Sequence, residues 1–93
     1  MGSEDTISGS FKSTKQTITS TAALLPTTSY AARKALLIKN TGSVTVYLGD
    51  RSVDTDGYPL EVGDELSFLA DDNAALYAVT DSSDGEIITL EGN

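Results

Sequence analysis

Short segments in which apolar and polar residues alternate recur along this chain. In residues 44–48 three aliphatic side chains alternate with Thr45 and Tyr47, and in residues 14–25 apolar residues alternate with threonines. A period of two places one set of side chains on one face of a β-strand. Both segments are therefore predicted to be strands. Pro26, which lacks the N–H that a continuing ladder needs, is predicted to end the second of them.

Two pairs of predicted strands are joined by short loops that are typical of β-hairpins. Residues 35–39 are an apolar run of strand length, and a loop in which Gly42 is available for a positive φ leads from them into residues 44–48. Residues 75–80 and 86–91 are joined by a segment that ends in Asp-Gly. Short glycine-containing loops between strands favour hairpins. The sequence thus predicts two local hairpins.

The rest of the chain adds one strand and several connections. Residues 65–69 are predicted to form a strand with Leu66 and Phe68 directed inward, and Tyr58 beside Pro59 is placed in a turn. No segment has a sustained helical period, and no linker divides the chain. About six to eight short strands at this spacing predict one all-β domain over residues 14–93, a small antiparallel β-sandwich that is jelly-roll or Ig-like.

Residues 1–13 differ from the rest because they are mostly small and polar. Apart from Met1, their large apolar side chains are Ile7 and Phe11. Two such side chains bury too little surface to offset the backbone entropy that is lost on ordering. We therefore expect a flexible N-terminal arm that orders only against a partner. The arm has neither the basic stretch nor the apolar stretch of a secretory signal, so none is expected.

Charge is distributed unevenly between the two halves of the chain. The formal net charge of −8 divides into +3 for residues 1–49, with five basic and two acidic residues, and −11 for residues 50–93, with one basic and twelve acidic residues. A duplex nucleic-acid binder needs a concentrated basic footprint, so nucleic acid is not expected as a partner. The acidic half is interpreted as solvated loops. The alternative is that the two halves face differently charged neighbours in an assembly.

The residue types that carry most enzyme chemistry are missing. The chain has no Cys and no His, and it contains no Gly-rich phosphate loop and no G-x-S-x-G elbow. These absences remove the usual general base near pH 7, the thiolate nucleophile and the commonest metal ligands. The protein is therefore predicted not to be an enzyme, with no catalytic residues and no cofactor.

One acidic segment resembles part of a calcium loop. Asp54-Thr55-Asp56-Gly57 fits the middle of an EF-hand, but that register places Ser52 where the first carboxylate belongs and Gly63 where the bidentate Glu belongs. We interpret the segment as a solvated turn and expect no metal.

The four tyrosines are candidates for stacking on sugars. Tyr47 and Tyr77 lie in predicted strands and Tyr58 lies beside a proline, whereas Tyr30 lies in a connection. An amphipathic aromatic packs well on a sheet with its hydroxyl at the edge, so packing in the core or at its rim is the favoured interpretation.

The order of motifs from Ala22 to Glu91 resembles a family of small bacteriophage virion proteins. In these proteins a threonine-rich strand that ends in Leu-Pro leads to a basic and apolar strand, an Asn-Thr-Gly turn and later strands. The matching segments are Leu24-Leu25-Pro26, residues 29–42, residues 44–49, Gly57-Tyr58-Pro59-Leu60 with Gly63, and Leu76-Tyr77-Ala78-Val79. The resemblance implies a non-enzymatic virion component with a β-sandwich fold, typically a head decoration (cement) protein, a head fibre or an appendage module, and often a trimer. It names no functional residues.

These observations together predict a decoration protein on the exterior of an assembled capsid. Its expected partner is the major capsid protein or another virion protein, it is expected to be a homotrimer, and it is made in the host cytoplasm without a membrane partner. The expected capsid or inter-subunit contacts are in and beside the arm, at Ile7, Phe11, Lys12 and Lys15. The alternatives are a tail or fibre accessory module and a carbohydrate-binding or surface-binding domain.

Overall fold

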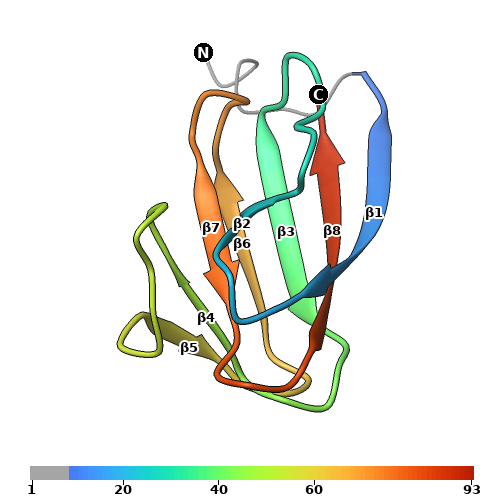
Figure 1. Cartoon of the computed structure of the whole chain (residues 1–93). Helices are drawn as coiled ribbons and strands as arrows, with labels where there is room; N and C mark the ends of the chain where they lie inside the picture. The colour runs from blue at the N-terminus through green and yellow to red at the C-terminus, as the bar shows by residue number, and fades with distance from the viewer. Residues whose placement is uncertain (1–8) are drawn as a thin grey trace.

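The strands of this protein form two antiparallel sheets packed face to face, as the computed structural model of residues 9–93 shows (Figure 1). Sheet I contains, in spatial order, β1 (Phe11–Ile18), β8 (Gly85–Gly92), β3 (Ala35–Asn40) and β6 (Glu65–Leu69). Sheet II contains β2 (Ala23–Leu25), β7 (Leu76–Val79), β4 (Val46–Gly49) and β5 (Tyr58–Leu60). The predicted all-β sandwich is confirmed.

The strands pair in a nested pattern. β1 pairs with β8, β2 with β7, β3 with β6 and β4 with β5, all antiparallel. Further ladders between β3 and β8 and between β4 and β7 join these pairs into the two sheets. This is the strand order of an eight-stranded jelly roll, in which one long ribbon of paired chain is wrapped into a sandwich. Of the two predicted sandwich types, the chain adopts the jelly roll.

Both predicted hairpins are wrong. β3 and β4 belong to different sheets, as do β7 and β8, so the loops that follow Asn40 and Val79 cross from one sheet to the other. Among the eight described strands, β4 and β5 are the consecutive pair that hydrogen-bonds together. A glycine-containing loop specifies a reversal of the chain, whereas the sheet that receives the next strand is decided by pairing with strands distant in sequence.

Three predicted boundaries also change. β1 begins at Phe11, so residues 11–13 belong to the sheet and not to an arm that ends at residue 13. The predicted strand over residues 14–25 is two strands, because β1 and β2 lie in different sheets; β2 ends at Leu25, as Pro26 predicted. Tyr58 and Pro59, placed in a turn, belong instead to strand β5, and Pro59 is tolerated there because β5 is an edge strand.

The core lies between the sheets and is aliphatic. Its buried members are Ile18, Leu25, Leu36, Ile38, Val46, Leu48, Leu60, Ala78 and Ile87. Val46 and Leu48 point inward as predicted, and Leu66 packs against the cluster from the edge. Full burial of one such side chain contributes about 1.5–3 kcal/mol. Phe68 occupies the inner side of β6 by register, yet it remains 38% exposed.

A buried asparagine organises the crossing from β3 to β4. The Asn40 side chain donates to the carbonyls of Val44 (2.9 Å) and Leu60 (2.8 Å), and its Oδ1 accepts from the Gly42 N–H (3.0 Å). A Cβ on Gly42 would lie 2.7 Å from the backbone nitrogen of Glu86. Gly42 is therefore required by close packing against β8, and not by the positive φ that the sequence suggested.

Candidate docking surface

The outer face of sheet I carries a group of exposed apolar side chains that the cross-strand register brings together. Residues directly opposite each other in neighbouring strands share one face of a sheet. The register therefore places on this outward face Phe11, Ser13, Lys15, Thr17, Ala35, Leu37, Lys39, Glu65, Ser67, Leu69, Glu86, Ile88 and Leu90. We call this set the sheet I outer face.

Apolar side chains occupy the half of this face nearest the N-terminus of β1. Phe11 is 64% exposed, Leu69 is 71% exposed and Leu90 is 38% exposed, while Leu37 and Ile88 are half-buried among them. Phe11, Ala35 and Leu69 lie in one cross-strand row with Gly92, and Leu37 and Leu90 lie in the next. A contiguous exposed apolar patch on a small protein marks an interaction surface.

The two central strands of sheet I have the composition of strands that are covered on both faces. In β3 the residues Ala35 to Ile38 are all apolar, and in β8 the buried Ile87 is followed by the outward Ile88. Near-continuous apolar runs are typical of strands buried on two sides. The inner face of sheet I is covered by sheet II, whereas none of the described elements covers the outer face. Apolar side chains thus lie on both faces of β3, although within residues 9–93 only its inner face is covered.

The charges on this face balance, in contrast to the acidic remainder of the molecule. Lys15 and Lys39 share a cross-strand row with Ile88 and Glu65, and Glu86 lies in the following row. The face is thus neutral in a chain whose formal net charge is −8. The other exposed carboxylates lie mainly in loops, where like-charge repulsion disfavours contact with another acidic surface.

The four residues predicted as contacts are not all found on the sheet I outer face. Phe11 and Lys15 lie on the sheet I outer face, whereas Lys12 lies on the inner side of β1, opposite Glu91 in the register. Ile7 lies outside the described residues. Sequence reasoning missed Leu37, Leu69, Ile88 and Leu90. Leu37 and Ile88 could have been found from the sequence, because each stands next to another apolar residue in its strand, so that both faces of the strand carry apolar side chains. Leu69 and Leu90 could be assigned to this face only from the cross-strand register.

A buried ion pair supports one end of this sheet. Arg33 Nη1 lies 3.1 Å from Glu91 Oε2, and both side chains are fully buried. The Arg33 guanidinium also donates to three carbonyls in the loop between β6 and β7, those of Ala70 (3.0 Å), Asp71 (2.6 Å) and Ala74 (3.0 Å). One arginine therefore ties β8 to the loop that follows β6. Sequence reasoning counted Arg33 as part of a basic segment and gave it no partner.

The acidic turn that resembles part of a calcium loop uses its carboxylates locally. Asp50 accepts from the Ser52 N–H (2.8 Å), and Asp54 accepts from the Thr55 N–H (2.8 Å). Within residues 9–93, no group of three or more Asp, Glu, His or Cys side chains is placed to hold a metal ion.

Two of the four tyrosines share the outer side of sheet II, since Tyr47 lies opposite Val79 and Tyr77 opposite Gly49, and the other two lie elsewhere. Tyr47 and Tyr77 lie in β4 and β7 and are half-buried, Tyr58 is an exposed residue of edge strand β5, and the hydroxyl of Tyr30 hydrogen-bonds Ser10. The strand positions predicted for Tyr47 and Tyr77 are confirmed. The tyrosines thus do not gather into one exposed stacking platform.

Comparison with protein families and with curated proteins finds no match, so the function is argued from the geometry described above. Among the described residues, no helix is long and apolar enough to cross a membrane.

Proposed function

We propose that this chain is a non-enzymatic structural protein of a bacteriophage virion that decorates the exterior of the assembled capsid. The observation that carries the proposal is the sheet I outer face, where Leu37, Ile88 and Leu90 form an apolar surface on strands whose composition suits burial on both sides. In this proposal the capsid, built from the major capsid protein, provides the second covering layer.

Three further observations support the proposal. The neutral apolar face is set in an acidic molecule, so one orientation toward a partner is favoured over the others. The jelly roll is a fold that occurs in viral coat proteins and in lectins, which is compatible with this role without requiring it. The motif order of the chain also resembles small virion proteins, which are often head decoration proteins.

A homotrimer is part of the proposal. Capsid lattices have three-fold and quasi-three-fold points, and a trimer matches the symmetry of such a site. Each sheet ends in exposed edge strands, with β1 and β6 in sheet I and β2 and β5 in sheet II, and association covers edges that otherwise invite nonspecific pairing.

The test is co-sedimentation with purified empty capsids of the same phage. The wild-type protein is expected to bind saturably. Leu90→Lys places a charge in the centre of the face and is expected to reduce affinity by roughly tenfold or more. Ser52→Lys adds the same charge to the exposed loop between β4 and β5 and is the matched control, with unchanged binding expected. Unsaturable binding, or equal affinity of Leu90→Lys and wild type, contradicts the proposal.

A further inference from the structure

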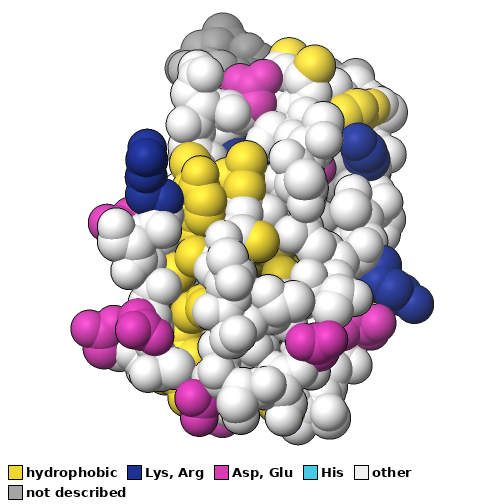
Figure 2. Space-filling model, viewed as in Figure 1, with side chains coloured by type: hydrophobic (Ala, Val, Ile, Leu, Met, Phe, Trp, Pro, Cys, Tyr) yellow, Lys and Arg dark blue, Asp and Glu magenta, His cyan; other side chains and the backbone are white. Residues whose placement is uncertain are grey.

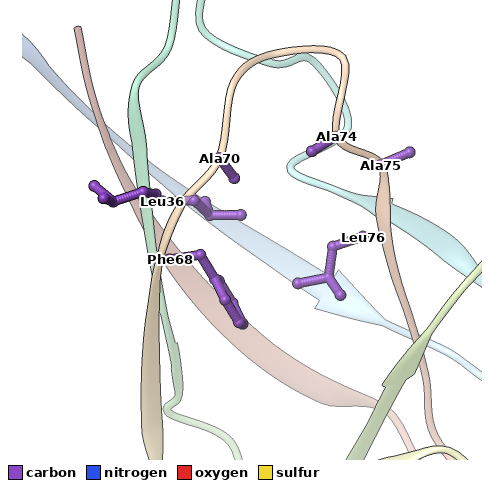
Figure 3. A pocket seen from close by; sticks show the side chains of 7 residues that line it. Leu36, Phe68, Ala70, Ala74, Ala75 and Leu76 are labelled. Carbon is purple, nitrogen blue, oxygen red and sulfur yellow. The ribbon is translucent and has the colours of Figure 1, made fainter. Parts of the chain in front are cut away.

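A second apolar feature lies at the open edge of the sandwich, where it shares Leu69 with the sheet I outer face. Two hollows of about 270 and 370 Å³ adjoin there, and Phe68 and Leu76 line both of them. Figure 3 shows these two side chains pointing toward each other beneath the loop that joins β6 to β7, with Leu36 behind them. The hollows therefore form one continuous groove along the inner side of β6, which we call the β6 groove.

The two long edges of the sandwich differ in how they are closed. At the edge formed by β1 and β2, the Gln16 side chain donates to the Leu24 carbonyl (3.0 Å) and accepts from the Thr27 N–H (3.2 Å), which links the sheets. Along β6, between Leu66 and Leu69, none of the hydrogen bonds described for residues 9–93 reaches sheet II. The β6 side thus remains open, with its apolar interior accessible.

The β6 groove adjoins an unpaired strand edge. β6 is the last strand of sheet I and pairs with β3 on one side only, so its other side offers backbone N–H and C=O groups to a further strand. Strand addition at such an edge derives affinity from the backbone and specificity from hollows that take alternate side chains. An added strand beside β6 directs every second side chain toward the groove.

The rim of the β6 groove is mainly acidic. Asp71 and Asp72 follow the lining residue Ala70, Asp50 follows the lining residue Gly49, and Glu65 precedes the lining residue Leu66; all four carboxylates are exposed. Basic residues also adjoin the groove: Arg51 follows Asp50, and the carbonyl of Lys34 accepts from the N–H of the lining residue Ala70. Figure 2 shows a stripe of hydrophobic side chains over the region of β6 and β7, with acidic side chains above, below and beside it.

From this combination we infer that the β6 groove binds an extended segment of another polypeptide as an added strand, with apolar side chains alternating with basic ones. The apolar side chains enter the two hollows beside Phe68 and Leu76, and the alternate basic ones project on the outer side of β6, where Glu65 lies. Residues 1–8 of this chain do not have that chemistry, because they contain Glu4 and Asp5 and no basic residue. The inference goes beyond capsid decoration, since the β6 groove has Leu69 in common with the sheet I outer face but is otherwise lined by different residues.

The test uses a blocked eight-residue peptide of alternating valine and lysine, titrated into the full-length protein and followed by amide NMR shifts and hydrogen exchange. We expect shifts centred on residues 66–69 and slower exchange of the β6 amides. A peptide of alternating valine and glutamate is the control and should bind at least roughly tenfold more weakly, because the rim repels it. Equal binding of the two peptides, or no shift in residues 66–69, overturns the inference.

Two variants locate the site. Phe68→Ala enlarges the groove and is expected to weaken the valine–lysine peptide by roughly tenfold. Ala75→Lys adds a repelling charge to an exposed lining residue without removing core contacts, so it tests the site even if Phe68→Ala lowers stability. Leu90→Ala, on the sheet I outer face, should leave peptide binding unchanged. If Ala75→Lys binds the valine–lysine peptide as tightly as the wild type, the inference is wrong. The capsid assay with Leu90→Lys tests the proposed function separately.

Discussion

Arg33 and Glu91 lie 58 residues apart in the sequence and form an ion pair without exposed side-chain surface. Glu91 Oε1 is buried and has no hydrogen-bond partner, so Arg33 contacts only the other carboxylate oxygen, Oε2. The arginine, in contrast, fills its donors with loop carbonyls. Removing the arginine would therefore leave a buried carboxylate and take a donor from three carbonyls, of which that of Asp71 still accepts from the Ala74 N–H.

We expect Arg33→Met to lower the free energy of unfolding by about 3–5 kcal/mol, because it strands the buried Glu91 charge. Replacing both partners, with Arg33→Met and Glu91→Leu together, is expected to recover part of this loss. Urea unfolding of the two single variants and the double variant measures the coupling. A loss below about 1 kcal/mol for Arg33→Met, the range of exposed pairs, would show that the pair is solvated in solution.

Val46→Asp is expected to unfold the domain. Val46 has no exposed surface and belongs to the aliphatic core, so the substitution buries a charge without a partner. Ser67→Asp introduces the same group at an exposed position of β6 and is the control. Thermal melting followed by circular dichroism compares them, and a cooperative transition of Val46→Asp at the wild-type temperature would be incompatible with the described core.

Two glycines should respond to alanine for different reasons. In Gly42→Ala the new Cβ would lie 2.7 Å from the Glu86 nitrogen, so backbone must move, and we expect a loss of about 1–3 kcal/mol. Gly63 has φ of 87° and open space around it, so Gly63→Ala should lose only about 1–2 kcal/mol from backbone strain. Chemical unfolding should show that Gly42→Ala is no more stable than Gly63→Ala. A higher free energy of unfolding for Gly42→Ala would contradict the close packing of Gly42 against β8.

Two deletions separate the N-terminal residues from β1. Deleting residues 1–8 is expected to leave the melting temperature nearly unchanged, because Met1 and Ile7 are the only large apolar side chains removed. Deleting residues 1–13 also removes Phe11, Lys12 and Ser13, which pair with β8, and should lower the melting temperature measurably. Capsid binding should fall with the longer deletion because Phe11 is lost. If the longer deletion changes neither melting nor capsid binding, β1 contributes nothing before residue 14.

Capsid binding should also weaken as salt concentration rises. Lys15 and Lys39 lie beside the apolar part of the sheet I outer face, and exposed ion pairs are screened within about 10 Å at 0.1 M ionic strength. Lys15→Gln is expected to reduce affinity at low salt and to flatten the salt dependence. Affinity measured by co-sedimentation between low and high salt tests this, and an identical slope for Lys15→Gln and wild type would remove Lys15 from the contact.

The fold class followed from the sequence because period-two alternation is a local signal. The strand at residues 35–39 was predicted for this reason, and the one at 44–48 overlaps β4, which begins only at Val46; the inward direction of Val46 was predicted as well. Their pairing was not, because the partners of β3 are β6 and β8, which lie far along the chain. Loop residues encode the reversal of the chain but carry no information about the sheet that receives the next strand.

The candidate surface was only partly predictable for the same reason. Phe11 was predicted as a contact residue within a flexible arm, and Lys15 as one beside it; the structure places Phe11, like Lys15, in β1. Leu69 and Phe11 lie in one row only because β8 and β3 separate β1 from β6, which is a property of the register. Arg33 was assigned to a basic segment, since no local pattern indicates that its partner is Glu91.

The nested pairing of the strands implies an order of folding. β4 and β5 are joined by a short loop, so their ladder closes first with the smallest loss of chain entropy. Once they pair, β3 and β6 are already near each other, and the same holds for β2 with β7 and then for β1 with β8. Folding can thus proceed outward from the β4–β5 ladder, with the β1–β8 ladder formed last. Substitutions in the β4–β5 ladder should then slow folding, whereas substitutions in the β1–β8 ladder should mainly speed unfolding.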